Sequence, residues 1–433
     1  MTWTGQEKIL ENQTLGERVV ERTHASGATV AFCRKPGYLR RYACFSTRFG
    51  SVDNRYRIGD GPEQELPDGI AHFLEHKMFE GPEEDAFMKF SRLGASANAF
   101  TSFVGTTYLF SCVDQFFPCL EHLVRFVQQP HFTEENVEKE KGIIGQEIRM
   151  YADNPGWRVY FNLLEGLYRD HPVAKDIAGT EQTIAGITPE ILDRCWSAFY
   201  HPSNMILLAV ADEDEETYFE HAGRLLAETD LGPAPEIEKI LTPESEGPAQ
   251  SEVRQQMQVG RSKVLFGWKD IHSGLFGREL MRKELVTELM LECVFGQSGP
   301  LFEQLYASEL IDDSFGTSYQ VHSDVGHSVS GGDSADPDQL ITTIRDQVGQ
   351  IRTSGIDPAD IERQRRSAIG YLLRAFNSLE HIASSYCGTR FLGADPFEVV
   401  DLLSEISHEE VETRLQEHLM PEQMSCSIVT SRS

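Results

Sequence analysis

The sequence lacks several features that mark particular classes of protein. No apolar run approaches the roughly 18 residues that a membrane span needs. The first residues, MTWTGQEKILENQTLGERVVERT, do not show the charged-then-apolar pattern of a secretory signal. None of the eight cysteines forms a C-x-x-C pair, which excludes a thiolate zinc site of that kind. We therefore expect a cytoplasmic protein that spans no membrane and keeps its thiols reduced.

Positive charge is also scarce. The 39 Lys and Arg residues stand against 68 Asp and Glu, which gives a formal net charge of −29. Such a chain repels phosphate groups, so nucleic acid is excluded as a non-specific partner. The negative excess fits either a solvated acidic surface or an acidic chamber that attracts basic peptides, and composition leaves both open.

The length and one compositional change predict the domain organisation. With 433 residues, of which 40% are hydrophobic, the chain can build about two to three domain cores. The segment 229–252 is rich in Pro, Glu and Gly, which is typical of an extended linker. We expect a metal-bearing domain at 1–228 and a second domain at 253–433.

The two halves show the same order of predicted elements, by apolar periodicity and turn residues. The first half predicts strands joined by a turn at Pro36-Gly37, then two helices, a hairpin and a long helix, at 28–35, 41–49, 67–79, 83–93, 97–112 and 134–152. The second half predicts a strand, two helices, a hairpin and a long helix, at 258–268, 278–295, 299–310, 313–332 and 358–379. This repeat predicts an α+β fold of two homologous α/β-sandwich domains, each an antiparallel-rich sheet with packed helices.

The helix predicted at 67–79 carries chemistry in the order His72-Phe73-Leu74-Glu75-His76. Two histidines at i and i+4 lie on one helix face and can reach one metal ion. Glu75 lies beside them, where its carboxylate can take a proton from a water activated by zinc. This is the reverse of the H-E-x-x-H order. The alternative is two surface histidines on an amphipathic helix.

Zinc with two histidines needs a third protein ligand and an open position for water. Glu140 and Glu147 lie seven residues, or two turns, apart on the long helix at 134–152 and project from one face. One can bind the metal while the other holds a ligand imidazole. The spacing leaves open which does which.

A second enzyme class has weaker support in the sequence. The segment from Gly326 to Ser330 is one residue short of the G-x-S-x-G motif of serine hydrolases. It lies in a predicted hairpin rather than at a strand-to-helix turn, which argues against a nucleophilic serine.

Three stretches resemble the pitrilysin–insulinase family of zinc peptidases, in its short branch typified by mitochondrial processing peptidase. They are GIAHFLEHKMFEG at 69–81, GASANAFTSFVGTTYLF at 94–110, which is similar to the family's N-A-x-T…T-x-Y segment, and EKEKGIIGQEIRMYADNP at 138–155. The resemblance covers most of the first half and extends to the second half by pattern only.

The resemblance implies a role for each motif residue. His72 and His76 correspond to the family's zinc ligands, and Glu75 corresponds to its general base. Glu147 corresponds to the third ligand and Glu140 to the supporting carboxylate. The implied cofactor is one Zn²⁺ per chain.

The resemblance also implies a substrate track. Asn98 and Ala99 correspond to a segment that pairs with substrate as an edge strand. Main-chain pairing of this kind binds an extended peptide with little regard to its sequence. The alternative is an ordinary hairpin position.

One departure from the family bears on partners. Active relatives supply an Arg and a Tyr from the second domain, but here Tyr306 stands at the arginine position and Asp313 or a neighbour at the tyrosine position. Tyr319 is a candidate displaced substitute. We therefore predict a heterodimer in which a homologous subunit supplies these groups, with a homodimer as the alternative.

The sequence thus predicts a zinc metalloendopeptidase for unfolded peptides, similar to the bacterial-type catalytic subunit of a two-subunit chamber. A non-catalytic assembly subunit is one alternative. A peptidase specialised for one precursor delivered by a partner is another.

Overall fold

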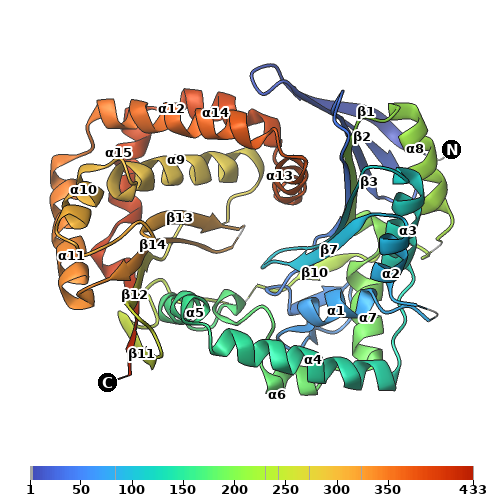
Figure 1. The fold of residues 1–433 in the computed structure, drawn as a ribbon, viewed down its shortest axis with the longest axis horizontal. Coiled ribbons are helices and arrows are strands. Elements are labelled where there is room, and N and C mark those ends of the chain that lie inside the picture. Colours follow the sequence, from blue (N-terminus) through green and yellow to red (C-terminus); the bar gives the residue numbers. More distant parts are fainter. Residues whose placement is uncertain are drawn as a thin grey trace. The chain divides into compact units, whose positions relative to one another are not determined.

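The computed structural model describes residues 3–82, 84–229, 231–241, 243–272, 274–322 and 324–432. The chain forms two compact units, drawn in Figure 1. Unit 1 comprises 1–148, 176–241 and 373–391, and unit 2 comprises 149–175, 242–372 and 392–433. Within the described ranges we find no helix that combines the length and the apolar character of a membrane span.

Unit 1 is built on a seven-stranded sheet in the order β1-β2-β3-β9-β4-β8-β7. Its strands are β1 (Trp3–Asn12), β2 (Glu17–His24), β3 (Thr29–Arg34), β4 (Arg41–Thr47), β7 (Ser96–Thr101), β8 (Thr106–Cys112) and β9 (Met205–Ala211). The turn at Pro36-Gly37 predicts that the strands at 28–35 and 41–49 pair with each other. The two strands exist as β3 and β4, but the predicted pairing is wrong. All seven residues of β9 are buried, and β9 lies between them, parallel to β3 and antiparallel to β4.

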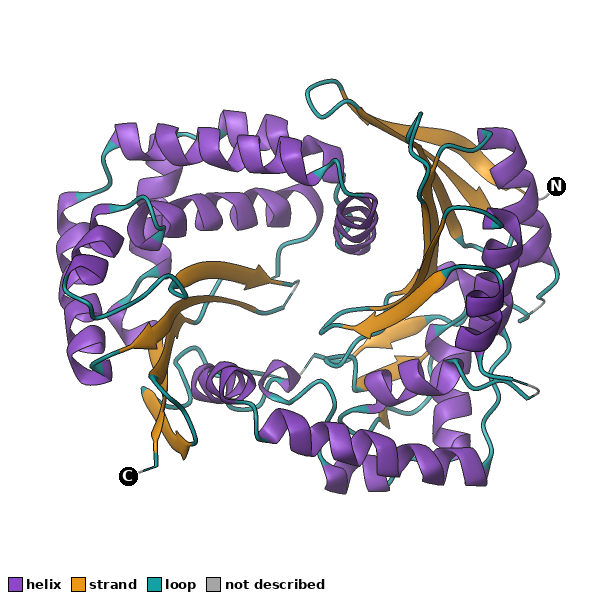
Figure 2. Cartoon of the chain, viewed as in Figure 1, coloured by secondary structure: helices purple, strands orange, loops and turns teal. Residues whose placement is uncertain are grey.

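Helices cover both faces of this sheet, as Figure 2 shows. One face carries α3 (Phe116–Gln128), α7 (Pro189–Phe199) and α8 (Glu215–Ala227), which enclose the main core of the unit. The other face carries α13 (Leu379–Phe391), which belongs to the second half of the sequence and packs on β4 and β9. Tyr386 and Arg390 of α13 both donate to the buried Glu21 carboxylate on β2, at 2.6 and 3.0 Å.

A small sheet and a layer of helices complete unit 1. The sheet has the order β10 (Ile237–Lys239), β5 (Arg55–Ile58) and β6 (Gln64–Glu65), so part of the expected linker at 229–252 is a strand. The helices are α1 (Ile70–Met78), α2 (Ala86–Arg92), α4 (Glu134–Ala152) and α6 (Glu181–Ala185). The helices predicted at 67–79, 83–93 and 134–152 are confirmed as α1, α2 and α4, and residue 83 lies outside the described residues.

Unit 2 repeats the central strand arrangement. Its five-stranded sheet has the order β11 (Glu252–Met257), β15 (Met424–Ser431), β12 (Ser262–Trp268), β14 (Gly326–Ser334) and β13 (Gly316–Val321). The pair β11–β15 is parallel and the other pairs are antiparallel. The series β3-β9-β4-β8-β7 of unit 1 has the same directions, which confirms the predicted fold of two homologous domains.

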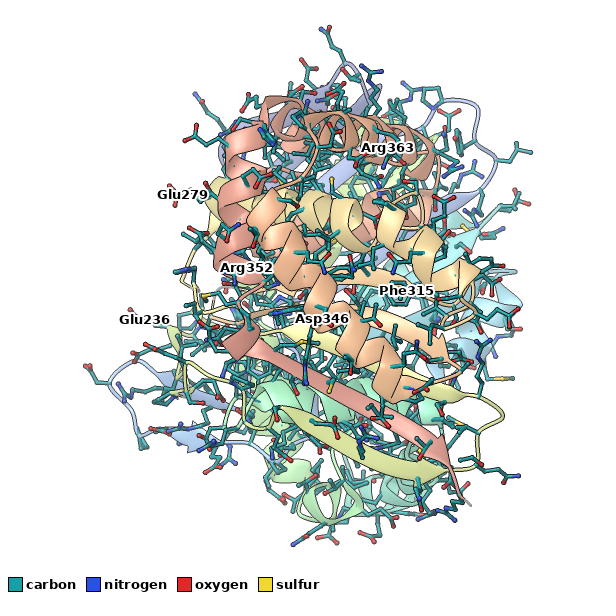
Figure 3. The ribbon with its side chains drawn as sticks, turned by 90° about the vertical axis from the view of Figure 1, so that its left-hand side faces the viewer. Glu236, Glu279, Phe315, Asp346, Arg352 and Arg363 are labelled. Atoms are coloured by element: carbon teal, nitrogen blue, oxygen red, sulfur yellow. The ribbon has the colours of Figure 1, made fainter. Side chains whose placement is uncertain are left out.

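The helices of unit 2 also lie on both faces of its sheet. One face packs against α9 (Gly277–Phe295), α11 (Pro337–Ser354), α14 (Val399–Glu405) and α15 (His408–His418). The other face packs against α5 (Pro155–Leu167), which comes from the first half of the sequence. The remaining helices are α10 (Pro300–Ala307) and α12 (Pro358–Ala375). In Figure 3, Asp346 and Arg352 mark α11, and Arg363 marks α12.

The halves of the sequence therefore exchange one helix each. α5 follows α4 in the chain and joins unit 2, while α13 follows α12 and joins unit 1. The predicted boundaries at 228 and 253 separate the sequence repeats, whereas the compact units cross them.

A buried polar cluster lies inside unit 2. The Asp270 carboxylate accepts hydrogen bonds from Arg414 and Tyr319 and forms an ion pair with Lys283 at 2.8 Å. Burial opposes ionisation of Asp270, but Arg414, His418 and Lys283 outweigh it and hold the pKa of the carboxyl well below its usual range. Glu417 also pairs with Arg414, at 3.9 Å, so the carboxylates of Asp270 and Glu417 balance the two cations.

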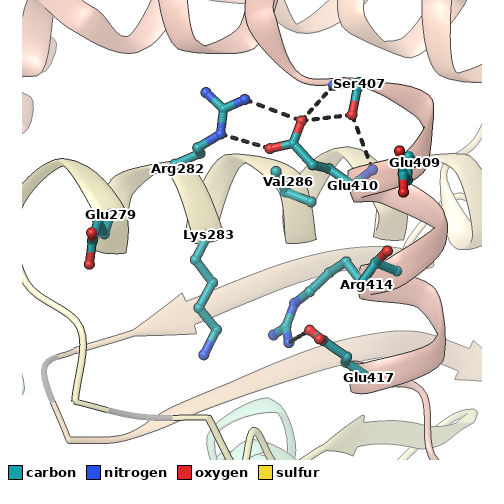
Figure 4. A pocket seen from close by; sticks show the side chains of 10 residues that line it. Glu279, Arg282, Lys283, Val286, Ser407, Glu409, Glu410, Arg414 and Glu417 are labelled. Atoms are coloured by element: carbon teal, nitrogen blue, oxygen red, sulfur yellow. Dashed lines mark hydrogen bonds and ion pairs between the residues drawn. The ribbon is translucent and has the colours of Figure 1, made fainter.

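The cluster borders a pocket of about 500 Å³ between α9 and α15, seen in Figure 4. Arg282 of α9 pairs with Glu410 of α15 at 2.8 Å, and Glu410 also forms the capping box of α15 with Ser407. These contacts fasten α15 to α9 across the pocket.

Candidate metal centre

Helix α1 begins at a position that only glycine fits. Gly69 has φ of +93°, and a Cβ added there would lie 2.5 Å from the carbonyl oxygen of Ala178. Phe73 and Leu74 are fully buried in the core of unit 1. Because these apolar residues fix the rotation of the short helix, His72 and His76 share the remaining face, one turn apart.

Helix α4 supplies the carboxylates. Thr133 and Asn136 exchange hydrogen bonds around the first turn, where the Asn136 side chain accepts from the Thr133 N–H at 2.9 Å. The buried Val137, Glu140 and Ile144 then form the inner face of the helix. Glu147 follows Glu140 by two turns and lies on the same side.

Three side chains converge on one point. Oε2 of Glu147 lies 3.7 Å from Nε2 of His72 and 3.6 Å from Nε2 of His76. One ligand atom from each residue lies within 4.8 Å of the other two. Tetrahedral ligands at the usual zinc distances lie about 3.3 Å from one another. The Glu147 oxygen therefore lies within a few tenths of an ångström of the separation from each imidazole nitrogen that a shared zinc ion requires.

The ring of His76 is oriented by a second carboxylate. Oε1 of Glu140 lies 3.0 Å from Nδ1 of His76. When Nδ1 carries the proton toward Glu140, Nε2 keeps its lone pair and faces Glu147. Burial works against protonation of His76, but Glu140, Glu75 and Glu147 together raise the pKa of the ring.

His72 is held neutral. Burial, with the neighbouring His76 ring, lowers the pKa of His72 to about 4. A neutral imidazole has a free lone pair, which a metal ligand requires. Two imidazoles and one carboxylate are also the donor set of catalytic zinc sites that keep one coordination position open. The residues present thus fit a zinc ion.

Glu75 lies beside this group and is 8% exposed. Thr101, on β7, donates a hydrogen bond from Oγ1 to Oε2 of Glu75 at 2.8 Å. Burial raises the pKa of the Glu75 carboxyl, and the Thr101 hydrogen bond and His76 oppose that rise. A carboxyl with a raised pKa is a better proton acceptor near neutral pH.

The candidate substrate strand is an edge of the sheet. β7 pairs with β8 and is the last strand of its series. Asn98 is exposed, and its Oδ1 accepts the N–H of Ala99 at 2.9 Å. The side of β7 that faces away from β8 can therefore accept a further strand.

The candidate functional residues in unit 2 differ in how far they are exposed. Tyr306 on α10 is 53% exposed and Asp313 is exposed. Tyr319 is 4% exposed and bonded to Asp270, so the idea that it serves as a displaced substrate-binding tyrosine is wrong. Ser328 is fully buried and contacts His418 at 2.9 Å, which removes it as an accessible nucleophile.

One contact was missed by sequence reasoning. Thr101 touches Glu75, yet the two residues are 26 positions apart and on different elements. The only signal in the sequence was the threonine of the N-A-x-T segment at 98–101.

Comparison with known proteins agrees with this arrangement. Residues 57–181 match the insulinase family (peptidase family M16), and residues 186–368 match the peptidase M16 inactive domain. The chain is 40% identical over 425 residues to the uncharacterized zinc protease YmfH of Bacillus subtilis strain 168, which covers 98% of this chain and 99% of that protein.

Solved structures give the same result for the fold. The crystal structure of an M16-like protein from Alicyclobacillus acidocaldarius is 34% identical, covers 100% of both chains and has a TM-score of 0.93. Pitrilysin has a TM-score of 0.76 at 15% identity and covers 100% of this chain and 47% of its own length. At that identity the likeness to pitrilysin concerns the fold alone.

Proposed function

The chain belongs to peptidase family M16, that of insulinase, and from this premise we propose that it is a zinc-dependent endopeptidase whose general base is Glu75. The observation that carries the proposal is the convergence of His72, His76 and Glu147 on one point, with the Glu75 carboxylate beside them. His72, His76 and Glu147 would hold the ion, and Glu140 would orient His76.

The zinc ion would supply Lewis-acid chemistry, which polarises a peptide carbonyl and makes water more acidic. The protein's own part is proton transfer at Glu75. Its free carboxylate oxygen takes a proton from the attacking water as the new C–O bond forms. It then gives that proton to the amide nitrogen as the C–N bond breaks. The raised pKa of Glu75 suits both steps.

The proposed substrates are unfolded peptides. The open edge of β7 supports this choice, because only an extended chain can add to it as a strand. The net charge of −29 supports a preference for basic segments.

The proposed assembly is a pair of homologous subunits. The segment 301–315 contains neither Arg nor Lys, and Tyr306 and Asp313 stand where relatives are expected to carry Arg and Tyr. A homologous partner would supply the missing cation to the substrate or transition state. Two copies of this chain would lack it equally, which favours a heterodimer over a homodimer.

Zinc content and peptide hydrolysis test the enzyme proposal. We expect about one zinc per chain in protein purified without chelators, and loss of both zinc and hydrolysis in His76→Ala. His131→Ala, which removes a histidine outside the metal centre, should change neither. Native protein with a full complement of zinc that cleaves no unfolded peptide, alone or with its co-purified partner, would favour a non-catalytic assembly subunit.

Co-purification of the native complex tests the partner proposal. Mass analysis should find a second, homologous chain that carries the Arg and Tyr. Full activity in the isolated chain would contradict the heterodimer while leaving the zinc assignment in place.

A further inference from the structure

We propose that Thr101 is a positioning residue that holds the general base and couples it to the substrate strand. This inference rests on the proposed function of Glu75. The Thr101 hydroxyl donates to one carboxylate oxygen, Oε2 of Glu75, at 2.8 Å. Glu75 itself is almost fully buried on α1, so this contact joins the helix of the metal centre to strand β7.

The direction of this hydrogen bond follows from its neighbours. Oγ1 of Thr106 lies 3.4 Å from Oγ1 of Thr101, and the Thr106 hydroxyl donates to the carbonyl of Phe49 at 2.9 Å. A hydroxyl has one hydrogen, and an ionised carboxylate can only accept. Because Thr106 gives its hydrogen to Phe49, it could only accept from Thr101, and it does so at the longer distance of 3.4 Å. The Glu75 carboxylate accepts at 2.8 Å, so the hydrogen of Thr101 is directed to Glu75.

The position of Thr101 is fixed by the turn that follows it. The Ser102 hydroxyl accepts from the N–H of Gly105 at 3.1 Å and donates to the Gly105 carbonyl at 3.0 Å. The N–H groups of Ser51 and Val52 donate to the carbonyls of Ser102 and Phe103 at 3.1 and 3.0 Å. The hairpin tip is therefore held from both inside and outside.

The segment at Gly50 lies so close to this hairpin tip that no side chain fits between them. A Cβ added to Gly50 would lie 2.4 Å from the backbone of Phe103. The N–H of Gly50 is in turn bound by the Asp53 carboxylate at 2.9 Å, and Lys239 pairs with Asp53 at 2.6 Å. Thr101 thus has little freedom to move away from Glu75.

Two consequences follow for the reaction. With Oε2 held by Thr101, the other oxygen of Glu75 is left to take the proton from water. The strand that holds the base is also the strand to which the substrate is proposed to add. Thr101 therefore sets the base at a fixed place relative to the substrate backbone, which is a role in orientation rather than in binding.

The test compares Thr101→Val, Thr101→Ser and Thr107→Val in the native zinc-loaded complex. Valine keeps the shape of threonine and removes the hydroxyl, while serine keeps the hydroxyl. Thr107→Val is the matched control: it removes a hydroxyl from the next strand, where it meets Ser46 at 2.9 Å and not Glu75. The measurements are kcat and KM on an unfolded peptide, zinc per chain by chelator competition, and the melting temperature without metal.

We expect Thr101→Val to lower kcat about 10- to 100-fold, the usual cost of losing an orienting partner. KM, zinc affinity and melting temperature should stay at wild-type values, since Thr101 has no role in holding metal or substrate. Thr101→Ser should restore most of kcat, and Thr107→Val should equal wild type. Adding Thr101→Val to Glu75→Gln should cause no further loss, because the two residues act as one unit.

Several results would overturn the inference. Wild-type kcat in Thr101→Val would do so, as would equal impairment in Thr101→Ser. Loss of zinc or of folding in Thr101→Val would assign Thr101 a structural role instead. The proposed function fails separately: full activity in Glu75→Gln would refute Glu75 as base, whereas an inactive Glu75→Gln beside a normal Thr101→Val refutes the positioning role alone.

Discussion

The two units share one strand order and use their buried polar groups in opposite ways. In unit 1, one ligand atom each of His72, His76 and Glu147, from α1 and α4, lies within 4.8 Å of the other two. In unit 2, the corresponding first helix, α9, provides Lys283, which pairs with Asp270 next to Arg414. One arrangement brings three possible metal ligands together, and the other pairs its cations with carboxylates. The same fold therefore supports either a ligand site or a structural ion cluster, according to whether the charges balance.

The largest expected effect tests the catalytic side of this contrast. Glu75→Gln should lower kcat about 10²- to 10⁴-fold, since the amide cannot accept the proton. Zinc per chain should stay the same, because Glu75 is not one of the three converging groups. Glu279→Gln, an exposed change on α9 of unit 2, should leave kcat unaffected. Steady-state kinetics with metal analysis decides, and a modest fall in Glu75→Gln would contradict the assignment.

The second prediction concerns the structural cluster. Asp270→Asn should destabilise the protein by about 3–5 kcal/mol, because it removes the buried counter-charge that Arg414 and Lys283 share. The His72–His76–Glu147 group is not part of that cluster, so zinc per chain in the folded protein should not change. Asp346→Asn on the surface of α11 is the matched control. Urea denaturation measures the effect, and an unchanged midpoint would show that the cluster is not self-neutralising.

A smaller effect is expected at the carboxylate behind the metal centre. Glu140→Gln should weaken zinc binding about 10- to 100-fold, because it removes the charge that orients His76. Glu138→Gln, on the same helix and paired with Lys141 at the surface, should have no effect. Competition with a chelator gives both affinities. Equal affinities in the two variants would show that Glu140 does not support the metal centre.

The smallest effect is a difference in acid stability. The pKa of Asp270 is depressed in the folded state, so its contribution is fully present above the unfolded value of about 4 and is lost as pH falls further. One such proton changes stability by at most about 1.4 kcal/mol per pH unit.

Wild type should therefore lose stability more steeply than Asp270→Asn below about pH 4. Urea midpoints of the two proteins without metal, measured over a pH series, give the difference, in which other titrating groups cancel. Parallel curves of urea midpoint against pH would mean that the buried cations do not stabilise the Asp270 carboxylate.

The sequence predicted what depends on local pattern. The apolar spacing on α4 gave its bounds, 134–152, and the period of α1 placed His72, Glu75 and His76 on one short helix. The insertion of β9 between β3 and β4 was missed, because the partner strand lies about 170 residues away and no local signal specifies such pairing.

The same limit applies to the candidate site. The two-turn spacing of Glu140 and Glu147 predicted a shared face but could not assign their roles, which depend on where each oxygen lies relative to His76. The contact between Thr101 and Glu75 joins a strand to a helix, so the apolar periodicity within the strand or within the helix cannot predict this contact.

The exchange of α5 and α13 has a consequence for how this chain can be divided. A break in the linker would release a first fragment whose sheet has lost the helix over Cys44 and Glu21. The second fragment would lack the helix that covers Val429 and Met257. Each fragment would carry the missing piece of the other, so the two repeats are suited to split-protein complementation and not to use as independent modules.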